Sequence, residues 1–241
     1  MRNFNLNGED WSLALEEIVK NSGHEFKDKR LLRLALTHAS YASEDQSGTS
    51  EWNERLEFLG DAVLQLVISE RLYKEMPNVQ EGELTRARSL LVDEPANARN
   101  ATEIGLTKAL LLGKGENLSG GRARQSIQGD LFEAFLGAVY LDGGLQEAKS
   151  VVDRIYPDIA TVLEKAEADD NPKGVLQHFS QTEFHGAPKY ETLSSEGPCH
   201  APHFVCQVTL PDGFACQGDG STKKAAEQAA ARKALKEHCT K

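Results

Sequence analysis

The sequence has no long apolar run of the kind that crosses a membrane. None of its stretches approaches the roughly 18 consecutive apolar residues that a spanning helix needs. The first ten residues also lack an apolar signal core, and they carry Glu9 and Asp10 rather than an arginine-rich face. We therefore expect a protein that is neither embedded in a membrane, nor secreted, nor imported into an organelle.

Cysteine is scarce, and its placement argues against a disulfide framework. The chain has 4 cysteines, none in a CxxC pair, and all fall in its last quarter: Cys199, Cys206, Cys216 and Cys239. A disulfide-stapled fold would spread its cysteines more widely. Charged residues make up 27% and hydrophobic residues 39%, as in ordinary globular proteins. The composition predicts a soluble protein of the reducing cytoplasm.

An overall excess of positive charge is also missing, because the formal net charge is −10. Taken over the whole chain, this balance argues against a polyanionic partner. The acidity is uneven, however. Residues 1–171 hold 19 Lys and Arg against 30 Asp and Glu, whereas residues 172–241 hold 8 against 7. The shorter C-terminal part is therefore free to approach an anion.

The chain divides where a polar, acidic segment ends at Pro172. We predict an all-α domain over residues 11–164, a linker over 165–171 and a small α+β domain over 172–241. Helix-like apolar spacing covers residues 11–20, 29–42, 54–75, 82–92, 128–141 and 145–163. After the linker the pattern predicts the order α-β-β-β-α, with helices over 172–184 and 222–238 and strands over 190–195, 203–210 and 214–218.

Two of the predicted helices carry acidic residues in informative places. Glu54, Glu57 and Asp61 lie along one face of the helix over 54–75, opposite an apolar stripe. Taken alone, these three acids are more typical of a solvated helix face. Asp130 and Glu133 differ, because the segment around them is apolar or small on every side, which predicts a buried helix.

A buried carboxylate must be protonated, paired with a cation or bound to metal, since an isolated charge there costs several kcal/mol. Arg122 and Arg124 in the preceding glycine-rich loop offer one alternative, a structural salt bridge. The other alternative is a metal site in which four carboxylates converge across two packed helices: Glu57, Asp61, Asp130 and Glu133. An oxygen-only set suits hydrated Mg²⁺, and such a site suits phosphodiester hydrolysis.

Four segments resemble the motifs of the ribonuclease III family, in the family's order and spacing. Residues 53–61 (NERLEFLGD) resemble its nine-residue signature, and residues 36–41 (LTHASY) resemble its LTHxSY element. Residues 81–92 (EGELTRARSLLV) and 129–138 (GDLFEAFLGA) follow downstream. The resemblance implies an Mg²⁺-dependent endonuclease, with Mn²⁺ able to substitute, that cuts double-stranded RNA and leaves 5′-phosphate and 3′-hydroxyl ends. It also implies the processing of ribosomal, messenger and transfer RNA precursors.

The resemblance also implies a role for each acid by its position in these motifs. The metal ligands would be Glu57, Asp61, Asp130 and Glu133. Asp61 and Glu133 match the catalytic pair, while Glu54 and Glu81 match acids that assist catalysis less directly. The chain departs from the family pattern at residues 128–129, where Gln-Gly replaces Leu-Ala, and at residues 93–97, where DEPAN replaces a more apolar stretch. We expect neither departure to touch a ligand, so both should affect local packing only.

Phe58 lies off the apolar stripe of its helix, beside the acids. Either a neighbouring helix covers it or it belongs to a subunit interface, because large apolar groups exposed near a site are typical of interfaces. The resemblance implies the second alternative, a two-fold homodimer in which Phe58 enters the partner and each subunit cuts one strand.

The C-terminal part resembles the double-stranded RNA-binding domain. The match is carried by residues 172–177 (PKGVLQ), 197–204 (GPCHAPHF) and 218–230 (GDGSTKKAAEQAA). Two lysines fall in the first turn of the last helix, where the helix dipole disfavours cations unless a phosphate docks there. The alternative is that these are ordinary exposed lysines. The residues that the resemblance places against RNA are Gln177, Glu183, His200, Thr222, Lys223 and Lys224.

Residues 199–206 (CHAPHFVC) imitate the ligand spacing of a zinc site. Phe204, Cys206 and Val208 alternate along one apolar face of a predicted strand, and His203 points to the other face. The four groups cannot converge without breaking the strand, so we expect no zinc.

The remaining alternative to the nuclease is a non-catalytic double-stranded RNA-binding protein that keeps the nuclease fold for dimerisation. The four intact acids favour the enzyme.

Overall fold

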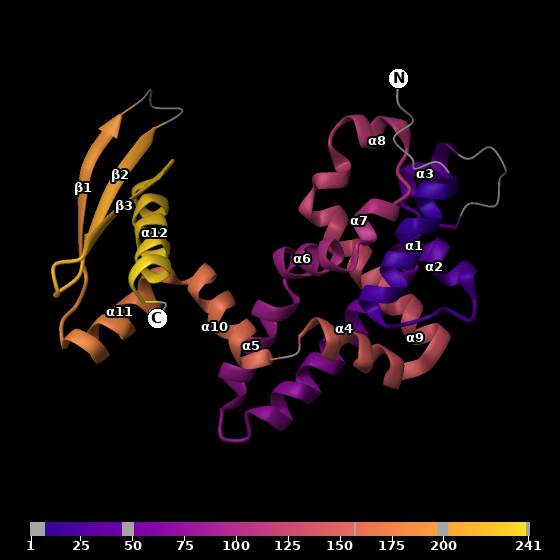
Figure 1. The fold of residues 1–241 in the computed structure, drawn as a ribbon, viewed down its shortest axis with the longest axis horizontal. Coiled ribbons are helices and arrows are strands. Elements are labelled where there is room, and N and C mark those ends of the chain that lie inside the picture. The colour runs from indigo at the N-terminus through magenta and orange to yellow at the C-terminus, as the bar shows by residue number, and fades with distance from the viewer. Residues whose placement is uncertain (1–7, 45–50, 157, 197–201, 240–241) are drawn as a thin grey trace. The chain divides into compact units, whose positions relative to one another are not determined.

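A computed structural model describes residues 8–44, 51–156, 158–196 and 202–239 of the chain. The chain forms two compact units, Met1–Ile159 and Ala160–Lys241. The described part of the first unit is built from helices, whereas the second combines a three-stranded sheet with helices (Figure 1). This confirms the predicted fold class. No helix among the described residues is long and apolar enough to span a bilayer.

The first unit is organised around two long helices, α4 and α9, which pack against each other. Its helices are α1 (Gly8–Ser22), α2 (Lys29–Ala35), α3 (Ala39–Glu44), α4 (Glu54–Glu75), α5 (Glu81–Val92), α6 (Glu94–Ile104), α7 (Leu106–Ala109), α8 (Lys114–Leu118), the 3-10 turn η1 (Gly121–Ala123) and α9 (Gln125–Ile155). Residues 134–139 of α9 are fully buried, and α4, α6 and α2 pack against this helix. The helix predicted over 54–75 coincides with α4.

The single helix predicted over residues 29–42 is wrong, because the structure has two helices there, α2 and α3. The chain between them forms a short parallel bridge, in which Thr37 pairs with Leu111. Leu111 donates its backbone N–H to the Leu36 carbonyl at 2.8 Å, and its own carbonyl accepts from His38 at 3.1 Å. These long-range hydrogen bonds replace the helical ones, and the apolar spacing of the sequence does not reveal them.

The two helices predicted over 128–141 and 145–163 correspond to the parts of α9 on either side of Gly144, where the backbone is not helical and φ is 78°. The second part ends earlier than predicted, at Ile155. The remainder begins a separate helix, α10 (Ile159–Asp170), and α10 continues through most of the segment expected as a linker, 165–171. Helices α6, α7 and α8 were not predicted, since their short sequences carry no clear apolar stripe.

Two glycines allow α4 and α9 to approach until their backbones touch. A Cβ atom on Gly60 of α4 would overlap the Glu133 carbonyl of α9, and one on Gly137 of α9 would overlap the Leu56 carbonyl of α4. Only hydrogen side chains fit at this crossing. The acidic residues that flank Gly60 in sequence are therefore brought against those that precede Gly137.

The second unit has the predicted order α-β-β-β-α. It consists of α11 (Pro172–Phe184), β1 (Lys189–Glu196), β2 (His203–Thr209), β3 (Ala215–Gly220), α12 (Lys223–Ala234) and a closing π-helical turn, η2 (Leu235–Cys239). The strands are antiparallel in the order β1-β2-β3, and α12 packs against the sheet beside α11 (Figure 1). Leu176, Val208 and Ala230 are among the residues of its buried core.

Replacing Gly60 by Ala tests the crossing. The added methyl group must push the α9 backbone away, so we expect the free energy of unfolding to fall by at least about 2 kcal/mol in denaturant titrations. Gly82→Ala is the matched control, because a Cβ there meets nothing within 4 Å. It should leave stability unchanged or raise it slightly, as Ala generally does in helices. Equal effects of the two substitutions would contradict the close approach.

Candidate active site and RNA-binding surface

The crossing of α4 and α9 gathers the four acids that the sequence singled out. Glu57 and Asp61 lie on α4, on either side of Gly60, and Asp130 and Glu133 lie on α9. All four residues are half-buried. Burial raises the pKa of Glu57, and the negative charges of Asp130 and Asp61 raise it further, so the charges act on one another across the two helices.

The carboxyl group of Glu133 has the most strongly raised pKa in the cluster. Burial raises its pKa from 4.5 to about 7, with further contributions from the negative charges of Asp61 and Glu57. Burial likewise raises the pKa of Asp130, and Glu94 adds to the effect. Glu94, in the first turn of α6, was missed by the sequence reasoning because it lies far along the chain from either signature. The cluster is therefore an accumulation of negative charge, which His38 offsets in part at Asp130.

The salt-bridge alternative is not what the structure contains. Arg122 donates to the backbone carbonyls of Thr107 at 2.6 Å and Leu110 at 2.9 Å. Arg124 pairs with Glu116 at 2.8 Å. Both arginines thus stabilise the loop before α9 and leave the acids unneutralised.

Two side-chain amides donate to the acids instead. Gln65 Nε2 donates to both oxygens of Asp61, at 2.9 and 3.1 Å. Asn97 Nδ2 on α6 donates to Glu133 Oε1 at 2.8 Å. The expectation that the DEPAN segment touches no ligand candidate is therefore wrong at Asn97. Gln65 follows Asp61 by one helical turn and could have been found from spacing, whereas nothing in the sequence connects position 97 with position 133.

The side-chain oxygen of Asn97 is a further sign that the cluster accommodates something more. Asn97 is 1% exposed, and its Oδ1 is buried with no hydrogen-bond partner. An unmet buried acceptor costs about 1–3 kcal/mol, so such atoms usually have a partner in the working protein. A hydrated divalent cation carries water molecules that donate hydrogen bonds, and carboxylate oxygens are the ligands that it prefers.

The acids do not stand in finished coordination geometry. Among the described residues, no three His, Cys, Asp or Glu side chains are placed to hold one ion as they lie. Like-charged carboxylates repel each other in the absence of a cation, and the amides hold Asp61 and Glu133 individually. The fit of a metal is carried by the oxygen donor set and by the unmet Asn97 oxygen, and the individual ligand roles stay predictions.

Glu54 and Glu81, the two acids expected to assist catalysis, are more exposed than the four acids of the cluster. Glu54 is exposed at the start of α4, where its charge contributes to the raised pKa of Glu57. Glu81 is exposed at the start of α5 and accepts from the Thr85 hydroxyl at 2.9 Å. Glu54 thus belongs to the electrostatic field of the cluster, while the contact given for Glu81 is local to its own helix.

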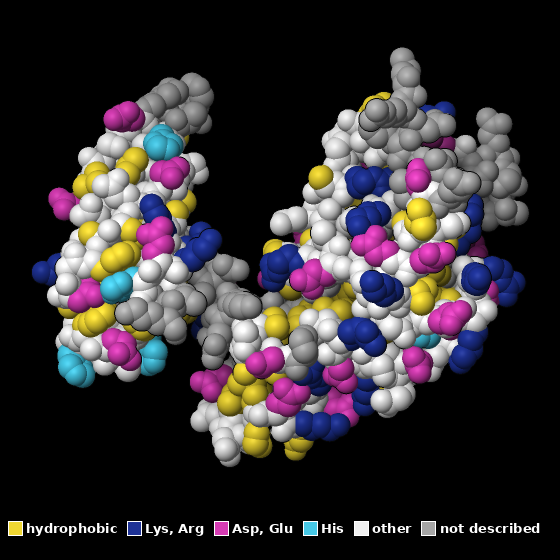
Figure 2. Space-filling view, in the orientation of Figure 1, with side chains coloured by type: hydrophobic (Ala, Val, Ile, Leu, Met, Phe, Trp, Pro, Cys, Tyr) yellow, Lys and Arg dark blue, Asp and Glu magenta, His cyan; other side chains and the backbone are white. Residues whose placement is uncertain are grey.

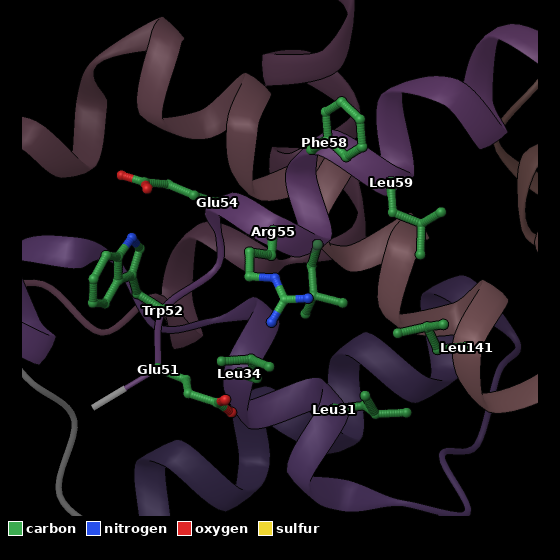
Figure 3. Close-up of a pocket in the computed structure, with 10 residues that line it drawn as sticks. Leu31, Leu34, Glu51, Trp52, Glu54, Arg55, Phe58, Leu59 and Leu141 are labelled. Carbon is green, nitrogen blue, oxygen red and sulfur yellow. The ribbon is translucent and has the colours of Figure 1, made fainter. Parts of the chain in front are cut away.

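Phe58 is 83% exposed, so none of the described helices covers it. It helps to line an apolar groove of about 780 Å³, whose other apolar side chains include Leu31, Leu34, Trp52 and Leu141. Figure 3 shows these side chains around Arg55, with those of α2 and α9 facing the start of α4. A large exposed aromatic group beside an apolar groove is typical of a protein–protein interface.

The second unit presents the expected RNA-facing residues at its surface, as far as the structure describes them. Thr222 caps α12 by accepting from the Ala225 N–H at 3.0 Å, and Lys223 and Lys224 follow in its exposed first turn. Gln177 and Glu183 are exposed on α11. His200 lies outside the described residues.

His203 and Cys206, the described residues of the 199–206 motif, are not placed to share a zinc ion. Cys206 is fully buried, whereas His203 is exposed and faces Asp219 at 3.3 Å. The two side chains leave opposite faces of β2, as the alternation predicted. Cys199 and His200 lie outside the described residues.

Comparison with known proteins identifies the family of both units. Residues 28–159 match the family model for ribonuclease-III-like proteins, and residues 172–238 match that for the double-stranded RNA binding motif. The chain belongs to the ribonuclease III family. It is an endoribonuclease specific for double-stranded RNA, with a separate domain that binds this substrate.

Curated relatives named Ribonuclease 3 resemble the chain over nearly its whole length. The chain is 46% identical over 222 residues to Ribonuclease 3 of Nitratidesulfovibrio vulgaris, which covers 92% of this chain and 87% of the relative. It is 44% identical over 224 residues to Ribonuclease 3 of Bacillus cereus, with 92% and 91% covered. The solved nuclease domain of ribonuclease III from Campylobacter jejuni is 38% identical, with a TM-score of 0.54, and covers 63% of this chain and 97% of that one. That structure concerns flexibility in a region involved in dimer formation.

The raised pKa of Glu133 predicts a pH dependence of stability in the metal-free ribonuclease. Because the folded-state pKa is about 7 and the ordinary value is 4.5, the contribution of Glu133 to stability is fully present below pH 4.5 and is lost as pH rises through 7. In EDTA, wild type should lose about 1–2 kcal/mol relative to Glu133→Gln between about pH 4 and 8, after allowance for solvent screening. Urea titrations at several pH values measure this difference, and a constant difference would contradict it.

Proposed function

We propose that this ribonuclease III uses Mg²⁺ to hydrolyse both strands of double-stranded RNA as a homodimer, leaving 5′-phosphate and 3′-hydroxyl ends. The proposal is carried by one observation, the gathering of Glu57, Asp61, Asp130 and Glu133 at the glycine crossing of α4 and α9, while Arg122 and Arg124 bind elsewhere. Oxygen-rich, acidic clusters of this kind also accept Mn²⁺, which we expect to substitute.

In this mechanism the chain supplies ligands, orientation and proton acceptors. Mg²⁺, when bound, lowers the pKa of a coordinated water and stabilises the leaving oxygen. Glu57, Asp61, Asp130 and Glu133 would supply carboxylate oxygens to hold it. Asp61 and Glu133 form the pair that orients the attacking water and accepts its proton, and Gln65 keeps the Asp61 carboxylate in one orientation. Glu54 adds negative charge at the rim of the cluster and so favours the approach of a cation.

The homodimer is supported by the exposure of Phe58 and by the groove beside it. A second copy related by a two-fold axis would bury this apolar surface on both subunits at once. Two active sites related in this way suit a duplex whose strands are themselves related by local two-fold symmetry, so that each subunit cuts one strand.

The RNA-binding proposal concerns the start of α12. Lys223 and Lys224, with the free N–H groups of the first turn, form a site for backbone phosphate, while Gln177, Glu183 and His200 face the minor groove. Domains of this kind read the A-form shape over about 16 base pairs with little sequence preference. Figure 2 shows acidic and basic side chains interspersed over the displayed face of the helical unit. We propose structured ribosomal, messenger and transfer RNA precursors in the cytoplasm as the substrates.

Glu133→Gln tests the catalytic proposal. On a perfect duplex with Mg²⁺, we expect cleavage to fall at least about 100-fold, because a metal ligand and proton acceptor is lost, while duplex binding is retained. Mixed dimers of wild type and Glu133→Gln should nick one strand only. Glu103→Gln, which changes an exposed carboxylate at the end of α6, is the control and should cut normally. Binding without cutting by the wild type would instead favour the non-catalytic alternative.

Lys224→Ala and Lys223→Ala test the phosphate site. Each substitution should weaken duplex binding, and log K should fall less steeply with log salt. The magnitude of the slope should decrease by about 1, since one phosphate contact is lost. Lys233→Ala, near the other end of α12, is the matched control and should leave the slope unchanged. Affinities measured by fluorescence anisotropy between about 50 and 200 mM salt decide the matter. Equal slopes for all four proteins would place the phosphate contact elsewhere.

A further inference from the structure

Asn97 is held rigidly against the acid cluster by its helix. The side chain of Asp93 caps α6 by accepting from the Ala96 N–H at 2.8 Å, and Pro95 occupies the first turn, where its missing N–H has no consequence. A Cβ on Gly129 of α9 would lie 3.8 Å from the Asn97 Cβ. Asn97 therefore lies where α6 crosses α9. It is beside Gly129, which precedes Glu133 by about one helical turn.

The hydrogen bonds of Asn97 determine how its amide is turned. Nδ2 donates to Glu133 Oε1 at 2.8 Å and to the Val92 carbonyl at 3.2 Å, so both of its hydrogens have acceptors. In the flipped orientation the amide oxygen would face two other oxygens, which is repulsive. Oδ1 is consequently the atom of this amide left over, and it is buried with no hydrogen-bond partner among the described residues.

A purely structural amide would look different, and α6 contains one. Asn100 donates to the Tyr156 hydroxyl at 2.6 Å, and that hydroxyl donates to the Leu91 carbonyl at 2.8 Å. This chain of hydrogen bonds ends on a backbone carbonyl and reaches none of the four acids. Asn97, one turn earlier on the same helix, instead reaches an acid of the cluster and keeps one acceptor unmet.

We infer that Asn97 is a positioning residue of the metal site, which holds Glu133 through its N–H and offers its buried Oδ1 to a water molecule carried by the bound divalent cation. The inference rests on the proposed function, because it requires a cation among the four acids. With Oε1 tethered, the Glu133 carboxylate keeps one orientation before the cation arrives. With Oδ1 free, the water shell of the cation gains an acceptor that the protein does not otherwise use.

The test compares Asn97→Leu with Asn100→Leu in the full-length protein without RNA. Calorimetric titration with Mg²⁺ alone should give a dissociation constant about 10-fold or more above the wild-type value for Asn97→Leu, as for other residues that orient metal ligands. Asn100→Leu loses a buried hydrogen bond of similar kind, so it should lower the thermal midpoint in EDTA and leave the Mg²⁺ dissociation constant unchanged. With saturating Mg²⁺, Asn97→Leu should lower kcat on a duplex and leave KM unchanged.

Each outcome bears on the inference. Wild-type Mg²⁺ affinity in Asn97→Leu, or tighter binding, would overturn it. Equal loss of affinity in both variants would also overturn it, since a general loosening of α6 would then be the cause. If Asn97→Leu does not fold, as judged by circular dichroism, Asn97→Ser carries the same expectation. A wild-type protein that neither binds Mg²⁺ nor cuts RNA would refute the proposed function itself, which distinguishes that failure from a failure of the role of Asn97 alone.

Discussion

The structure depends on one close contact, the place where the backbones of α4 and α9 meet. Gly60 and Gly137 allow it, because any side chain larger than hydrogen would overlap the opposing backbone. The contact has an electrostatic consequence. Two acids on each helix are carried into a partly buried space, and the pKa of Glu133 rises to about 7 there. Packing thus concentrates negative charge that a proton or a bound cation can neutralise.

The cluster stands out against the treatment of acids elsewhere in the same unit. Glu70 also lies on α4, but hydrogen bonds from Lys149 and Lys74 lower its pKa to about 2. Glu116 is paired with Arg124. The raised pKa values of Glu57, Asp130 and Glu133 and the unmet oxygen of Asn97 occur together in this cluster. Locally unfavourable chemistry in an otherwise consistent fold is typical of a functional site.

Much of this arrangement could be predicted from the sequence, and the remainder has identifiable physical reasons. Helix α4 and the buried centre of α9 follow from local periodicity, and the acids follow from their position on those helices. The break between α2 and α3 depends on hydrogen bonds to Leu111, which is far along the chain. The contact of Asn97 with Glu133 depends likewise on the packing of α6 against α9. Neither leaves a trace in periodicity, and the DEPAN segment was assigned to packing alone for that reason.

The central claim is that the four acids gather around a divalent cation. Anomalous X-ray diffraction from crystals soaked in Mn²⁺ tests it most directly, because the scattering locates the ion without reference to activity. The account predicts a peak bonded to carboxylate oxygens of both α4 and α9. Crystals in which Mn²⁺ binds only elsewhere, while protein cations neutralise these carboxylates, would contradict it.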